Sequence, residues 1–106
     1  MKQDSILEQL DGIFSSFTEL TVAAIDNLYN NKMQDGLKLA LEVYEGISEV
    51  KTILAQMSFP GIEELDKIYV AISDAYENKD YVLVADLLEY ELLNRLTNWR
   101  KQMLKG

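Results

Sequence analysis

Apolar residues recur at intervals of three and four along nearly the whole chain, and short polar breaks divide them into four runs. This spacing brings one apolar face round with every turn of an α-helix. The pattern predicts four helices, over about residues 5–30, 34–57, 62–77 and 80–104. Because no segment alternates between apolar and polar residues with a period of two, we expect no β-strand.

Local signals at the ends of these runs agree with the predicted helices. Ser5 followed by Glu8 forms a capping-box pattern before the first run. Pro60 and Gly61 end the second run, because proline disfavours helical angles in the residue that precedes it. Asp80 is placed to cap the fourth helix, since its carboxylate can accept hydrogen bonds from the free N–H groups of the first turn.

The fourth run carries the clearest apolar stripe, and we expect the other three helices to pack against it. Its predicted core positions are Tyr81, Val84, Ala85, Leu88, Leu92, Leu96, Trp99 and Met103. Basic residues gather after Glu91, where cations complement the negative end of the helix dipole. The pattern therefore predicts one long α-helix over this run.

The two halves of the chain also resemble each other. With a shift of 47 residues, residues 24–32 align with residues 71–79, and five of the nine positions are identical. We interpret this internal similarity as two helical hairpins, about 5–57 and about 62–104. The alternative is chance, because amphipathic helices often have the same residue types at equivalent positions. Short turns make consecutive helices antiparallel neighbours. The sequence therefore predicts an all-α, up-and-down antiparallel four-helix bundle that forms a single domain over residues 1–106.

Composition narrows the possible functions. The 106 residues include no cysteine and no histidine, which removes thiolate metal ligands and the usual general base. Eighteen acidic residues against ten basic ones give a net charge of −8, which disfavours nucleic acid and anionic membranes and favours basic partners. With no apolar run near the ~20 residues that span a bilayer and no signal-peptide pattern, we expect a cytoplasmic protein.

No motif for phosphate, dinucleotide, metal or acyl-transfer chemistry is present. Pairs of carboxylates occur at Asp86 and Glu89 and at Glu42 and Glu45, but a di-metal bundle would also need histidines that project inward. We therefore expect neither a cofactor nor a metal, and no enzymatic activity.

A second apolar stripe on the fourth helix lies away from its core stripe. On a helical wheel Leu83, Leu87 and Tyr90 face a different direction from the core line. One interpretation is a contact surface for a protein partner or for a second copy of the chain. The alternative is that this helix is broadly buried between two neighbours.

Aromatic residues near the predicted helix ends form a second candidate site. They are Tyr29, Tyr44, Tyr69, Tyr76, Tyr81 and Trp99. These side chains either line a ligand pocket or pack their rings into the core with the tyrosine hydroxyls at its rim.

The run from Tyr76 to Leu92, followed by Trp99, resembles a group of small acidic helical proteins of Gram-positive bacteria. The resemblance is firmest over residues 71–99, and it implies no assigned activity and no site residue. In size and charge the chain is also similar to the bundle-type chaperones of flagellar export, although it carries no motif of theirs.

These observations favour a non-enzymatic protein-interaction module, an adaptor or chaperone-like bundle that binds a protein partner, for example an amphipathic helix in a groove. Two alternatives stay open. One is a small-molecule sensor or binding bundle with a tyrosine-lined pocket, and the other is a self-associating structural dimer.

Overall fold

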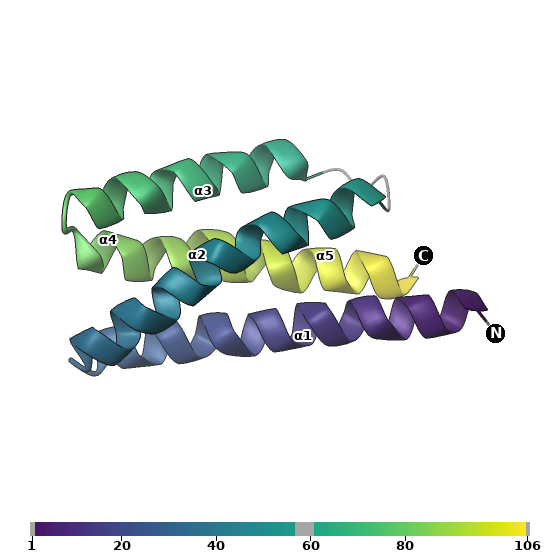
Figure 1. The fold of residues 1–106 in the computed structure, drawn as a ribbon, viewed down its shortest axis with the longest axis horizontal. Helices are drawn as coiled ribbons and strands as arrows, with labels where there is room; N and C mark the ends of the chain where they lie inside the picture. Colours follow the sequence, from purple (N-terminus) through teal and green to yellow (C-terminus); the bar gives the residue numbers. More distant parts are fainter. Residues whose placement is uncertain (1, 57–60, 106) are drawn as a thin grey trace.

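Four helical rods joined by short connections make up the computed structural model (Figure 1). The structure describes residues 2–56 and 61–105, and for residues 2–7 and 103–105 it describes the backbone alone. The first three rods are α1 (Lys2–Tyr29), α2 (Met33–Gln56) and α3 (Ile62–Glu77). The fourth rod, called the fourth helix below, consists of α4 (Tyr81–Asp86), η1 (Leu87–Leu93) and α5 (Asn94–Lys105) in unbroken succession. The predicted all-α four-helix bundle is confirmed.

The helices form a closed ring of neighbours. α1 packs along α2, α2 packs on α3, and α3 packs on α4 and η1. The fourth helix then closes the ring against α1, which contacts α4, η1 and α5. Figure 1 shows both hairpin turns at one end of the bundle and both chain termini toward the other, with α2 inclined to the remaining helices. The elongated result measures 45 × 24 × 18 Å.

The predicted stripe of the fourth helix forms the centre of the core. Six of its positions are buried, namely Val84, Ala85, Leu88, Leu92, Leu96 and Trp99. Tyr81 is half-buried, and the side chain of Met103 lies outside the described residues. Facing this stripe are buried residues of the other helices, such as Phe14, Val43 and Leu65. Burial of these stripes, rather than helix propensity alone, therefore stabilises the bundle.

One predicted helix start is confirmed and another is wrong. The Asp80 carboxylate accepts a hydrogen bond of 3.2 Å from the Leu83 N–H and caps α4, as expected. At the N-terminus, however, α1 begins at Lys2, so Ser5 lies inside the helix and does not cap it. Lysine and glutamine are good helix formers, so residues 2 and 3 extend the helix past the capping-box pattern.

The fourth helix is not one uniform α-helix, because η1 is a π-helix. Four buried residues of the fourth helix follow one another at intervals of four, namely Val84, Leu88, Leu92 and Leu96. In an α-helix each such step turns the side chain about 40° away from the previous one, so the series would leave the core. A π-turn closes its hydrogen bond over one additional residue and thereby absorbs the surplus. All four side chains consequently remain buried.

The two hairpin turns have the same hydrogen bonding. Asn31 and Lys79 both adopt positive φ, 62° and 57°, and both follow the end of a helix. In each turn the next N–H reaches back five residues, as in a Schellman motif. These bonds are Lys32 N to Asn27 O and Asp80 N to Ala75 O, both 2.9 Å. The turns therefore correspond at a spacing of 48 residues, so the spacing of 47 in the internal similarity does not align equivalent turn positions.

A bidentate ion pair joins α1 to α5. The Arg100 guanidinium donates to both carboxylate oxygens of Asp11, at 2.5 and 3.2 Å. Hydrogen bonding from Arg100 lowers the pKa of Asp11; desolvation opposes this shift, and the positive charge of Arg100 adds to it.

This ion pair predicts a pH-dependent difference in stability between the wild type and an Arg100→Gln variant. A lowered carboxyl pKa contributes stability above the ordinary pKa of 3.8, and the contribution disappears as the pH falls through the folded-state value. Urea unfolding should therefore show the wild type more stable at about pH 7, with the difference shrinking as the pH falls below the ordinary carboxyl pKa of 3.8. An equal difference on both sides of that pKa would contradict the assignment.

Alanine substitutions at two glycines, one on α1 and one on α2, should change the stability of the protein in opposite directions. A Cβ added at Gly12 meets nothing within 4 Å, so Gly12→Ala should stabilise the protein by up to about 1 kcal/mol through helix propensity. At Gly36 a Cβ would lie 2.8 Å from the Leu28 side chain and 2.9 Å from its backbone nitrogen. Gly36→Ala should therefore cost about 1–3 kcal/mol in urea unfolding, because the backbone of α1 cannot move aside. If both variants shift stability the same way, the close approach of α1 and α2 at Gly36 is wrong.

Candidate functional site

The expected interface on the fourth helix is partly exposed. Leu83 is 42% exposed and Tyr90 is 59% exposed, whereas Leu87 is half-buried against the core. Val82, which sequence reasoning did not single out, is the most exposed large apolar residue described, at 71%. The outer face of α4 and η1 therefore carries uncovered apolar surface, with its greatest exposure at the start of α4.

Exposed apolar side chains gather around both hairpin turns. Five of them lie within three residues of the turns at 30–32 and 78–80, and we call them the turn-end surface: Tyr29, Met33, Tyr76, Val82 and Leu83. They come from α1, α2, α3 and α4, whose turns lie at the same end of the bundle (Figure 1). Because no single helix carries this grouping, helical periodicity could not predict it.

Acidic charge is concentrated in the same half of the molecule. Residues 24–45 and 70–91, called the acidic half below, carry ten acidic and three basic side chains. The rest of the chain carries eight acidic and seven basic side chains, so nearly all of the net charge of −8 lies around the turns. Such a field attracts cationic partners and repels anionic ones.

Tyr29 of α1 makes a hydrogen bond to the fourth helix. Its hydroxyl donates a hydrogen bond of 3.0 Å to Asp86 Oδ1, and its ring is about half exposed rather than in the core. Hydrogen bonding to Glu89, with smaller effects of desolvation and of Asp86, raises the pKa of Tyr29 well above its ordinary value. The phenol therefore keeps its proton and remains a hydrogen-bond donor to Asp86.

The other four predicted tyrosines pair off between α2, α3 and α4. Tyr44 and Tyr69 stack with ring centroids 4.2 Å apart and 16° between their planes. Hydrogen bonding to Tyr44 raises the pKa of Tyr69. Tyr76 and Tyr81 meet edge to face at 6.2 Å. Aromatic pairs in these geometries hold each other in place.

Between α2 and α3 lies a small hollow, called the α2–α3 pocket below. Its volume is about 130 Å³, and its lining residues are Ala40, Leu41, Tyr44, Ile72, Ser73, Tyr76, Glu77 and Val84. Ala40, Ile72 and Val84 are buried and form its apolar floor. Of the six predicted pocket aromatics, Tyr44 and Tyr76 line it, whereas Tyr29, Tyr69, Tyr81 and Trp99 do not.

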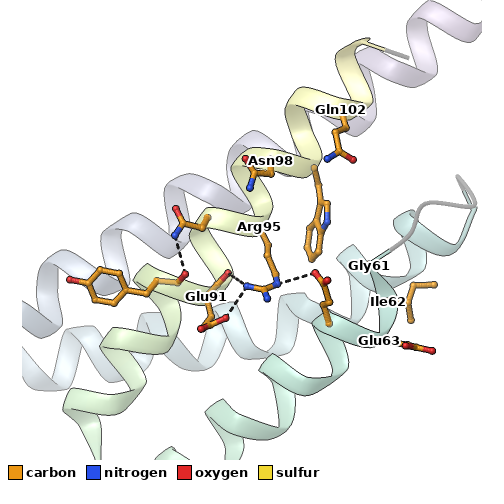
Figure 2. Close-up of a pocket in the computed structure, with 11 residues that line it drawn as sticks. Gly61, Ile62, Glu63, Glu91, Arg95, Asn98 and Gln102 are labelled. Carbon is orange, nitrogen blue, oxygen red and sulfur yellow. Dashed lines mark hydrogen bonds and ion pairs between the residues drawn. The ribbon is translucent and has the colours of Figure 1, made fainter.

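A larger polar groove of about 1020 Å³ lies between the start of α3 and the η1–α5 segment (Figure 2). Arg95 donates to Glu64 of α3 at 3.0 Å and to Glu91 of η1 at 2.8 Å, as the dashed lines in Figure 2 show. Trp99 is buried here, and a Cβ at Gly61 would lie 2.9 Å from its ring. The arginine thus serves to tie α3 to the π-helix.

The lining of this polar groove does not suit an anion. Three carboxylates, Glu63, Glu64 and Glu91, line the groove together with the Arg95 guanidinium, which already donates to Glu64 and Glu91. Exposed amides of α5, such as Asn98 and Gln102, also line the groove. Among the residues that the structure describes, no group of three or more possible metal ligands comes together. In the same described ranges, no helix combines the length and apolar character needed to cross a bilayer.

Fold and surface together define an acidic all-α four-helix bundle with uncovered apolar side chains at its turn end. The chain belongs to the family described as "Domain of unknown function (DUF8042)", whose model matches residues 5–102. The match extends well beyond residues 71–99, over which the sequence resemblance was firmest. No curated protein and no solved structure matches the chain.

Proposed function

We propose that this protein is a non-enzymatic interaction module, an adaptor or chaperone-like bundle that binds a protein partner through its turn-end surface. The observation that carries the proposal is the gathering of Tyr29, Met33, Tyr76, Val82 and Leu83 at one end of the bundle. Exposed apolar side chains that gather among polar groups on one part of a surface are typical of protein contact sites. The proposal includes a cytoplasmic location and a place among small acidic helical proteins of Gram-positive bacteria.

Charge supports a protein partner over nucleic acid or an anionic membrane. The acidic half surrounds the apolar side chains with ten carboxylates and three ammonium groups. Nucleic acid and anionic lipid both need positive charge on the protein, so neither fits this end. A cationic protein surface would be attracted to it and would find aromatic and aliphatic anchors there.

Co-purification from extracts of the native cell tests this proposal with a matched pair of double variants. Val82→Ser with Leu83→Ser removes apolar side chains from the turn-end surface without changing charge. Ile13→Ser with Val22→Ser removes two exposed apolar side chains, 36% and 39% exposed, from α1 outside the acidic half. We expect a partner that binds the wild type and the α1 variant but not the turn-end variant. Equal recovery by all three proteins, or no specific partner, would refute the proposal.

The α2–α3 pocket gives some support to the alternative of a small-molecule binding bundle, because Tyr44 and Tyr76 line an apolar hollow there. Thermal-shift screening against metabolites distinguishes the two functions. A ligand held at about 100 times its dissociation constant should add about 2.7 kcal/mol of stability. A stabilising metabolite together with no protein partner would favour the alternative.

A further inference from the structure

We propose that the α2–α3 pocket receives one aromatic or branched aliphatic side chain from a cationic amphipathic helix of the partner. This inference rests on the proposed protein-binding function and specifies the site and the chemistry of the bound segment. The pocket opens within the acidic half, where Leu41 and Tyr76 at its rim are each about two-fifths exposed.

The size of the pocket selects a single side chain. A volume of about 130 Å³ is close to that of engineered apolar cavities of about 150 Å³ that bind one benzene molecule. The floor, formed by Ala40, Ile72 and Val84, is apolar and closed to solvent. One ring or one branched aliphatic group therefore fits, whereas a drug-sized molecule needs roughly 300 Å³ or more.

The tyrosine pairs preform the pocket. Tyr44 forms part of one wall and is stacked on Tyr69, while Tyr76 on the other side is held edge to face by Tyr81. A pocket whose walls are already held in place loses less conformational entropy on binding. This rigidity favours an anchor site, in which a few buried contacts supply most of the affinity.

The charge around the pocket specifies the flanking residues of the bound segment. Glu77 lines the mouth beside Tyr76, and its side chain is exposed. A lysine or arginine one helical turn from the anchor would reach this carboxylate, since residues three and four apart share a helix face. The excess of carboxylates in the acidic half would favour further cations along the same helix.

Selection from a phage-displayed library of 16-residue peptides, followed by titration of the selected synthetic peptide, tests the pocket. We expect selected sequences to place a large apolar residue within one helical turn of a lysine or arginine. Ser73→Leu, which fills the pocket, should weaken binding of that peptide by about 30-fold, the loss typical of an anchor site. Replacing the anchor by alanine should lower wild-type affinity to the same level.

Two controls keep the result interpretable. Ser48→Leu adds the same side chain to an exposed part of α2 and should leave affinity unchanged. Glu77→Gln, an exposed substitution that cannot disturb the core, should weaken binding a few-fold and reduce its salt dependence. Peptides that lack an anchor, that are acidic, or that bind Ser73→Leu as tightly as wild type would overturn the inference.

Recovery of the natural partner from cell extract distinguishes failure of this inference from failure of the proposed function. If Ser73→Leu still recovers the partner while Val82→Ser with Leu83→Ser does not, the module binds protein and the pocket has no part in it. Loss of the partner with both variants, when Ser48→Leu retains it, supports the pocket as the anchor site. Stabilisation by a metabolite that Ser73→Leu abolishes would instead assign the pocket to a small molecule and overturn the inference.

Discussion

Deleting Glu45 from α2 should abolish cooperative folding, whereas deleting Tyr90 from η1 should leave the protein folded. Removing one residue from an α-helix rotates everything beyond it by about 100°. In α2 this would turn Ile47, Val50 and Leu54 out of the core. Burying each such side chain is worth about 1.5–3 kcal/mol, and the sum approaches the whole stability of a small domain, about 5–15 kcal/mol.

The Tyr90 deletion has the opposite effect because η1 already contains one residue more than a regular α-helix needs. Shortening the interval between Leu88 and Leu92 from four residues to three restores ordinary helical spacing, so the flanking segments keep their faces. Glu91 and Arg95 also remain four residues apart. Urea unfolding followed by circular dichroism should place this variant within about 1 kcal/mol of the wild type. An unfolded Tyr90-deletion protein would show that the π-helix does not absorb a surplus residue.

Leu88→Ala should cost about 2–5 kcal/mol, while Leu83→Ala on the same helix should cost less than about 1 kcal/mol. Leu88 is fully buried in the centre of the bundle, so its truncation leaves a cavity. Leu83 is 42% exposed, and truncation there removes little buried contact. The free energy of unfolding in urea measures both values.

This pair also distinguishes the two interpretations of the second stripe on the fourth helix. If the helix is buried between neighbours on all sides, both leucines should be costly to truncate. If the outer face is a contact surface, Leu83→Ala should be nearly neutral for folding and should weaken partner recovery. A large loss of stability for Leu83→Ala would therefore count against the turn-end surface as a binding site.

Much of the fold was predictable because helical periodicity reports burial directly. The stripe from Val84 to Trp99 predicted which face of the fourth helix enters the core, and Asp80 predicted where that helix begins. Both signals are local, since they depend on spacing within one helix. For the same reason, the polar breaks between the apolar runs predicted where along the sequence the four helices lie.

The π-helix escaped prediction although its signal is present in the sequence. The intervals of four residues from Val84 to Leu96 differ from the mixed threes and fours of a regular stripe. A regular helical pattern is compatible with intervals of three or of four residues. The apolar spacing alone therefore does not reveal the additional residue between Leu88 and Leu92. The capping-box expectation at Ser5 failed for a different reason: α1 extends past it to Lys2.

The candidate site was predicted only in part because it is assembled from several helices. Leu83 and Tyr90 were identifiable from the wheel of one helix, and both are exposed. Tyr29 and Met33 belong to the turn-end surface only because the two hairpin turns lie at the same end of the bundle. The α2–α3 pocket likewise depends on how α2 lies against α3, which no single-helix pattern reports.

Photo-crosslinking in the native cell tests binding at the turn-end surface most directly. The crosslinking residue p-benzoylphenylalanine would replace Val82 at the start of α4 in one protein and the exposed Lys101 of α5 in another. We predict a discrete crosslinked product from position 82, reduced by Ser73→Leu if the α2–α3 pocket anchors the partner, and no product from position 101. Absence of a product at position 82, or equal products at both positions, would contradict binding through the turn-end surface.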